Sequence, residues 1–176
     1  MGQHFTIVVP EDKPFMRKAF FVVHLIDSAL KVIFNQEKRI NSRINHDNPS
    51  SLPILFGDIH LYFINAANIK EYLDKLSEYF SEDLAFDKIR KSHQDTFAKL
   101  SSLRNHQEHI LDGRLDGMGK IEPLSEPSML GNISNGEYNF GGEKIDLVKS
   151  FREFEQLQTE LMDWNRDSKV YPLWYV

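Results

Sequence analysis

The sequence contains no cysteine. This absence excludes disulfide bonds, thiolate zinc sites, cysteine nucleophiles and redox dithiols, and it agrees with a reducing compartment. Long hydrophobic runs are also missing, because the longest, Ala19 to Ile26, is interrupted by His24 and is far shorter than the roughly 20 residues of a membrane span. The N-terminus shows neither the basic region nor the apolar stretch of a secretory signal. These absences predict a cytoplasmic protein that has no membrane partner.

A surplus of positive charge is absent as well. The chain has 21 Lys and Arg residues against 26 Asp and Glu residues, which gives a formal charge of −5. Nonspecific coating of nucleic acid needs many basic groups to release counterions from phosphates, so the charge argues against it and leaves room only for a local site. The length of 176 residues favours a single domain over 1–176.

Glycine is scarce outside one stretch, and apolar residues elsewhere recur every three or four positions, the pattern of amphipathic helices. This periodicity predicts four helices, over about 14–44, 51–80, 82–111 and 148–164. Seven of the nine glycines lie in 113–146, which we interpret as loops. Within it, Asn135-Gly136 between two short runs predicts a β-hairpin, since both residues tolerate positive φ.

Short connections place consecutive helices side by side. The predicted fold is therefore all-α: an antiparallel four-helix up-and-down bundle with a small β-hairpin insertion between helices three and four. The last residues, 170–176, form an apolar tail, which we expect to pack on its own domain or at a dimer contact.

Specific catalytic motifs are missing: the sequence has no phosphate loop, dinucleotide-binding glycine pattern, nucleophile elbow, zinc-protease motif or di-iron signature. What remains is the end of the third predicted helix, where polar and ionisable residues gather. These are Arg104, Asn105, His106, Gln107, Glu108 and His109. Residues 86–120 carry seven basic against five acidic residues, so this region is the basic part of an acidic chain.

Arg104 and His109 diverge by about 140° around a helix, so one copy does not aim both at one atom. They converge if the helix lies at a two-fold axis. There the arginine fork would hold a phosphate and the histidine would act as general acid or base. The negative end of the helix dipole favours the charged form of His109. Such a site suits metal-free cleavage of RNA through its own 2′-hydroxyl and needs no cofactor.

The segment Arg104-Asn105-x3-His109, late on the third helix of a four-helix bundle, resembles the motif of the HEPN superfamily (higher eukaryotes and prokaryotes nucleotide-binding). The continuation Glu108 to Asp112 and the segment 140–144 look like those of bacterial HEPN-like proteins. The motif covers about 11 residues, whereas the helix order covers most of the chain.

The resemblance implies a homodimeric RNA-binding protein of toxin or defence type, acting as a metal-independent endoribonuclease. Arg104 and His109 would be catalytic, with Asn105, His106 and Glu108 supporting them, and a cognate antitoxin would be a natural partner protein. The insertion at 113–146 departs from a minimal HEPN bundle.

Two other functions stay open. Some family members lack activity, so the chain fits a non-catalytic dimer or partner-interaction module that uses the hairpin and the tail. A His-based metal site is the third alternative, because His106 and His109 lie one turn apart. Three or four converging ligands would be needed, and His24 and His60 lie on other predicted helices.

Overall fold

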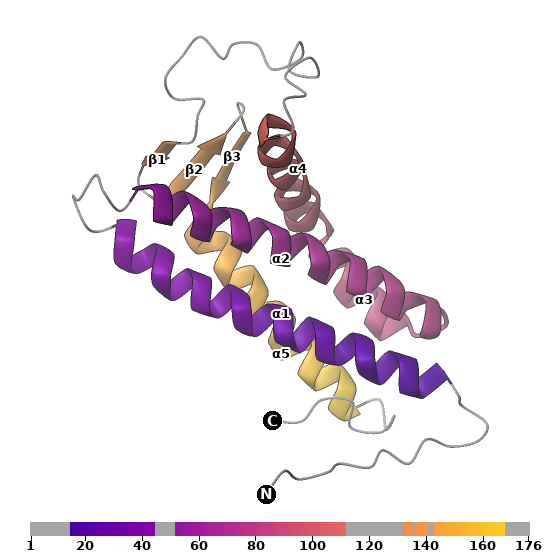
Figure 1. The fold of residues 1–176 in the computed structure, drawn as a ribbon. Coiled ribbons are helices and arrows are strands. Elements are labelled where there is room, and N and C mark those ends of the chain that lie inside the picture. Colours follow the sequence, from indigo (N-terminus) through magenta and orange to yellow (C-terminus); the bar gives the residue numbers. More distant parts are fainter. Residues whose placement is uncertain (1–14, 45–51, 112–131, 135, 141–142, 168–176) are drawn as a thin grey trace, which may run out of the picture.

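The computed structural model describes residues 15–44, 52–111, 132–134, 136–140 and 143–167. It is mostly helical, which confirms the all-α prediction in its coarse form (Figure 1). The regular four-helix up-and-down arrangement is not confirmed, because five helices and a three-stranded sheet lie within the described ranges. In chain order these are α1 (Phe15–Ile44), α2 (Leu52–Tyr79), α3 (Leu84–Ser92), α4 (Gln94–Leu111), β1 (Asn132–Ser134), β2 (Glu137–Phe140), β3 (Glu143–Asp146) and α5 (Leu147–Asp167).

The two longest helices, α1 and α2, lie side by side and run in opposite directions, and α5 crosses behind them (Figure 1). The predicted stripes are on their buried faces, with residues such as Ile26, Ile33, Ile59 and Leu73 almost fully enclosed. Near the α1–α2 connection, Arg39 and Arg43 of α1 hold the buried carboxylate of Asp58 from α2. Each carboxylate oxygen faces one arginine, so the pair of helices is fixed at this end.

The stretch predicted as one helix over 82–111 is two helices that meet at His93. The buried His93 ring explains the break. Its Nδ1 lies 3.2 Å from Glu153 Oε2, and its Nε2 lies 2.9 Å from Glu160 Oε2; both carboxylates belong to α5. The side chain is only 2% exposed. Tertiary contacts to α5 therefore override a local sequence that favours a continuous helix.

The start of α3 is capped by an aspartate that also binds α5. Asp83 is the N-cap, and its Oδ1 accepts a hydrogen bond from the Phe86 amide at 2.9 Å. Its other oxygen, Oδ2, accepts a hydrogen bond from Trp164 Nε1 at 2.9 Å. One aspartate thus satisfies a free helix amide and attaches the end of α5 to the start of α3.

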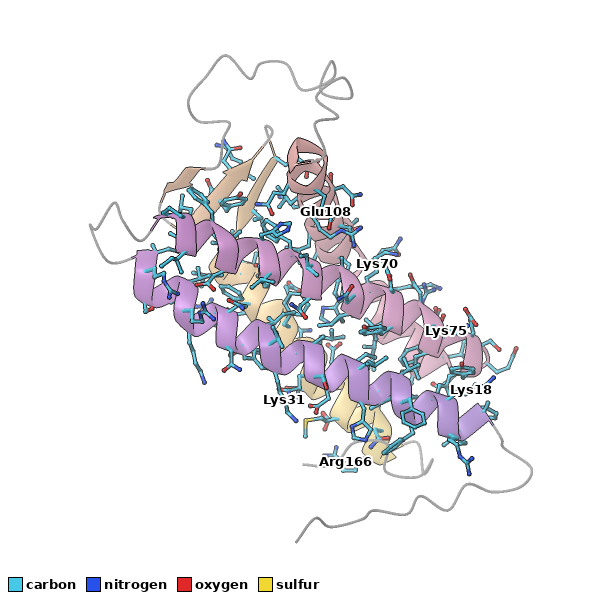
Figure 2. The ribbon with its side chains drawn as sticks, in the orientation of Figure 1. Lys18, Lys31, Lys70, Lys75, Glu108 and Arg166 are labelled. Atoms are coloured by element: carbon cyan, nitrogen blue, oxygen red, sulfur yellow. The ribbon has the colours of Figure 1, made fainter. Side chains whose placement is uncertain are left out.

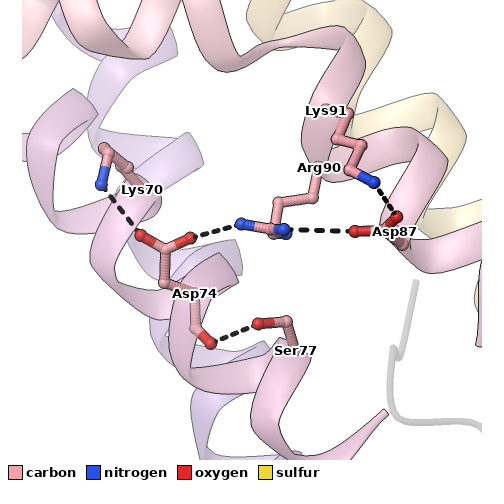
Figure 3. Close-up of polar contacts among 6 residues, drawn as sticks. All are labelled: Lys70, Asp74, Ser77, Asp87, Arg90 and Lys91. Carbon is pink, nitrogen blue, oxygen red and sulfur yellow. Dashed lines mark hydrogen bonds and ion pairs between the residues drawn. The ribbon is translucent and has the colours of Figure 1, made fainter. Parts of the chain in front are cut away.

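An ion-pair network joins α2 to α3 (Figure 3). Arg90 of α3 bridges Asp74 of α2 and Asp87 of its own helix, with N–O distances of 3.1 Å to each. Lys70 pairs with Asp74, and Lys91 pairs with Asp87. Burial works to raise the pKa of Asp74, but the hydrogen bonds from Lys70 and Arg90 outweigh it and hold that pKa below its ordinary value. The contacts of Arg90 therefore hold α2 and α3 together.

The predicted hairpin is present and forms two strands of a three-stranded antiparallel sheet in the order β1-β2-β3. Gly136 has a φ of 80°, the left-handed conformation that the Asn-Gly prediction requires; Asn135 lies outside the described residues. The third strand, β3, was not predicted. It pairs Ile145 with Tyr138, and both side chains are buried.

The last helix, α5, agrees with the prediction over 148–164. Asp146 accepts a hydrogen bond from the Lys149 amide at 2.8 Å, so the end of β3 caps the helix. Its predicted apolar face is buried and consists of Phe151, Phe154, Leu157, Leu161 and Trp164. Together with buried residues of the other four helices, β2 and β3, these side chains form one hydrophobic cluster.

Length and hydropathy would allow α1 to cross a membrane, although 44% of the residues in its apolar window are buried inside the protein. Core helices commonly combine these properties, so the feature leaves the predicted location open. Two other expectations, the loops over 113–131 and the apolar tail 170–176, lie outside the described residues.

Candidate functional site

The predicted site lies in the last two turns of α4 (Figure 1). Phe97, Leu100 and Leu103 bury one face of this helix, with Leu100 and Leu103 fully enclosed. That apolar face fixes the rotation of α4 against α2. Arg104, the next residue, therefore lies at the edge of the buried face, and its side chain is 25% exposed.

Arg104 contacts two of the other predicted residues, Asn105 and Glu108. Arg104 Nη2 donates a hydrogen bond to Asn105 Oδ1 at 3.1 Å, and its Nε lies 3.5 Å from Glu108 Oε2. The Nε atom is shielded from solvent and makes no hydrogen bond. The Glu108 side chain is 43% exposed. Figure 2 shows Glu108 on α4, at the opposite end of the molecule from Arg166 of α5. Asn105 and Glu108 are thus the two described neighbours of the Arg104 guanidinium, and their supporting roles stay a prediction.

His106 and His109 belong to the helical backbone of α4, and their side chains lie outside the described residues. Because Arg104 and His109 share one helix, the 140° divergence expected between them holds for the backbone. The convergence of Arg104 and His109 at a two-fold axis stays a prediction, because the His109 ring lies outside the described residues.

Sequence reasoning missed a polar chain centred on Gln107. His60 Nδ1 of α2 lies 2.7 Å from Gln107 Oε1, and Gln107 Nε2 donates a hydrogen bond to the Tyr138 hydroxyl of β2 at 2.6 Å. Only the position of Gln107, four residues after buried Leu103, hinted at an inward direction. These two contacts connect α2, α4 and the sheet through residues that are distant in sequence.

Tyr138, at one end of these contacts, packs in the hydrophobic core. Its ring packs on Phe56 and Phe63 of α2, with ring centroids 6.5 Å and 5.5 Å away. Burial raises the pKa of Tyr138 to about 12, against the opposing effect of the hydrogen bond from Gln107. The phenol is thus neutral near pH 7, and its interactions here are structural. A second link, from Ser102 Oγ to Glu143 Oε1 at 2.7 Å, attaches α4 to β3.

No three His, Asp or Glu side chains in the described part of the chain form a group that would hold a metal ion. His93 contacts two glutamates, but opposite ring nitrogens face them, so these three groups do not point at one atom. The proposed His106–His109 pair stays a prediction because neither ring is described.

Comparison with known proteins adds no relative. No protein-family model matches the chain, and neither a curated protein nor a solved structure matches it. The functional argument therefore depends on the residues and their geometry.

Proposed function

We propose that this protein is a HEPN-like RNA-binding protein in which Arg104 contacts a phosphate of the RNA. One observation carries the proposal: among the described residues, the guanidinium of Arg104 pairs only within its own helix, with Asn105 and Glu108. The interhelical arginines differ, because Arg39 and Arg43 hold Asp58 and Arg90 holds Asp74. A planar guanidinium that does not join helices suits bidentate phosphate binding.

Asn105 and Glu108 support this role in different ways. Asn105 is exposed and accepts a hydrogen bond from Arg104, which orients the fork. Glu108 is 3.5 Å from the guanidinium, which is longer than an ordinary hydrogen bond, so a phosphate that accepts two hydrogen bonds from the guanidinium would replace this contact. Affinity for RNA would then be moderate and sensitive to salt.

The catalytic form of the proposal requires a homodimer. Two copies of α4 at a two-fold axis would supply Arg104 from one copy and His109 from the other, so that a proton donor faces the held phosphate. His106 would line the same cleft. In this form the protein is a metal-independent endoribonuclease of the cytoplasm, of toxin or defence type, with an antitoxin as partner. The α3–α4 pair would be the third segment of a HEPN-like four-helix bundle.

The test compares the full chain with Arg104→Ala, His109→Ala and a control, Arg152→Ala, an exposed arginine on α5. Each protein is incubated with a mixture of RNAs in EDTA to follow cleavage. Binding is measured separately by fluorescence anisotropy. We expect Arg104→Ala to weaken binding by about tenfold, the equivalent of about 1.4 kcal/mol for a lost charge-assisted contact. His109→Ala should retain binding and lose cleavage, and the control should retain both.

Indistinguishable cleavage by all four proteins would remove the catalytic claim. Equal binding by the unaltered protein and Arg104→Ala would remove the phosphate contact. Failure of the unaltered protein to bind any RNA would favour the partner-interaction module instead.

A further inference from the structure

A cavity of about 290 Å³ lies where α4, β3 and the start of α5 meet. It is separate from Arg104: Lys99, on the cavity side of α4, precedes Arg104 by five residues, which places the two about 140° apart around the helix. Its volume lies at the lower end of the range for small-molecule sites, enough for a phosphate group and part of the group that it is attached to.

Three lysines from three elements line this cavity: Lys99 of α4, Lys144 of β3 and Lys149 of α5. All three are exposed, and among the described residues none forms an ion pair. Four other described lysines form ion pairs, for example Lys31 with Asp27 and Lys91 with Asp87, whereas Lys18, Lys38 and Lys88 form none. The cavity thus collects ammonium groups that the fold itself does not use.

Carboxylates also line the cavity, but two of the three have donors of their own. Asp146 accepts the Lys149 amide as the N-cap of α5. Glu153 Oε2 lies 3.2 Å from Nδ1 of His93. Glu137 has neither contact, so the lining carries three ammonium groups and three carboxylates, two of which already have donors within the protein. The hydroxyl of Thr96, on the same wall, adds a neutral hydrogen-bond donor.

We infer that the cavity between α4, β3 and α5 is a phosphate-binding site, with Lys99, Lys144 and Lys149 as its cationic groups. Lysine binds phosphate as a point charge and does not need the fixed fork of arginine, which fits three flexible side chains that approach from different elements. This site needs neither Arg104 nor a second copy of the chain. It is therefore independent of the proposed function, although an RNA strand is one source of the phosphate.

The sources of the phosphate are a free anion, the 5′ end of a strand and an internal phosphodiester. The full chain is titrated with two ten-nucleotide RNAs labelled at the 3′ end, one with and one without a 5′-phosphate, and binding is followed by fluorescence anisotropy. Inorganic phosphate and pyrophosphate serve as competitors. Preference for the phosphorylated strand indicates its end, equal binding indicates internal phosphodiesters, and competition by either anion indicates a site for the free group.

The variant K99Q/K144Q/K149Q is compared with K31Q/K75Q/K91Q, which removes the same charge from lysines that are paired elsewhere. We expect the cavity variant to lose at least about tenfold in affinity and to reduce the salt dependence of log K by about 1 for each lysine that contacts phosphate. The control should change affinity by less than about twofold. Circular dichroism of both variants establishes that they are folded.

Equal losses in the two triple variants would overturn the inference, because net charge would then explain them. No loss in the cavity variant, or no binding of any probe by the unaltered protein, would overturn it as well. Arg104→Ala separates this inference from the proposed function: a loss there without a loss in the cavity variant would leave the Arg104 site standing and remove this one.

Discussion

The ionised form of Glu37 is less favourable in the folded protein than in the unfolded chain. It lies on α1 and is only partly exposed. Burial and the nearby carboxylate of Glu155 raise its pKa above the ordinary value for glutamate, and Lys38 opposes them only weakly. A carboxyl group whose pKa is raised by folding binds its proton more tightly in the folded state, so its ionisation lowers the free energy of unfolding.

We therefore expect Glu37→Gln to stabilise the protein at pH 7. The gain should be small, roughly 1 °C in Tm, because solvent still reaches Glu37 and screens its charge. It should shrink as the pH falls, since Glu37 is protonated and harmless in acid. Thermal unfolding at pH 7 and pH 4 measures this, with Glu71→Gln, an exposed glutamate of α2, as control. A gain that is equal at both pH values would contradict the electrostatic explanation.

Contacts at the candidate site are of two kinds: those between neighbours on one helix and those between residues distant in sequence. The proximity of Arg104 to Asn105 and Glu108 follows from helical spacing, and the sequence predicts it. The contacts of Gln107 with His60 and Tyr138 do not follow, because they join residues 47 and 31 positions apart. Local periodicity contains no information on which distant polar group meets an inward amide.

Among the elements, the junction of α3 and α4 depends most on distant residues. His93 attaches it to α5 through Glu153 and Glu160. Burial works to raise the pKa of Glu160, but hydrogen bonds from Gln156 and His93 outweigh it and lower that pKa below its ordinary value. The resulting stabilisation is present above the pKa of an unfolded glutamate and is lost as the pH falls through the lowered value. Acid should therefore loosen α5 from this junction.

We expect His93→Gln to lower the free energy of unfolding by about 1–3 kcal/mol, because it leaves shielded carboxylates with fewer donors. Denaturant unfolding of His93→Gln, Glu160→Gln and the double variant measures their coupling. The double variant should lose less than the sum of the single variants, by about 0.5–3 kcal/mol. His24→Gln, at a histidine that packs on Phe20, is the control. Strict additivity of the two changes would show that the His93–Glu160 contact contributes nothing.

The helices with a continuous apolar stripe, α1, α2 and α5, were predicted with nearly correct ends because each stripe repeats over many turns. The break at His93 was not predicted, since its cause lies 60 and 67 residues away in the sequence. Strand β3 was missed for a similar reason. Its four residues are recognisable only by their pairing with β2, which places Ile145 opposite Tyr138.

At the scale of the molecule, buried side chains of the five described helices and of β2 and β3 form one cluster. Its aromatic end lies where α2, α3 and α5 meet, with the Trp164 ring 5.1 Å from Phe80 and 4.9 Å from Phe86. A shared core of this kind predicts that the described elements unfold together, as expected of the single domain proposed for 1–176.

Thermal unfolding of Trp174→Phe tests this cooperativity, because the chain has two tryptophans and the variant leaves Trp164 as the only one. We expect far-ultraviolet circular dichroism, which reports all helices, to give the same Tm as the fluorescence of Trp164. A lower Tm by fluorescence would mean that the α3–α5 end unfolds separately from the α1–α2 pair. Measuring the unaltered chain by circular dichroism controls for any effect of the substitution.

The attachment of α4 to the sheet has a consequence for how substitutions on the two elements combine. Ser102 Oγ donates a hydrogen bond to Glu143 Oε1, and Gln107 Nε2 donates one to the Tyr138 hydroxyl, so the end of α4 and the hairpin are held together by direct side-chain contacts. Residues that share a hydrogen bond are energetically coupled. A substitution at either end of these two contacts should therefore change the effect of a substitution at the other end.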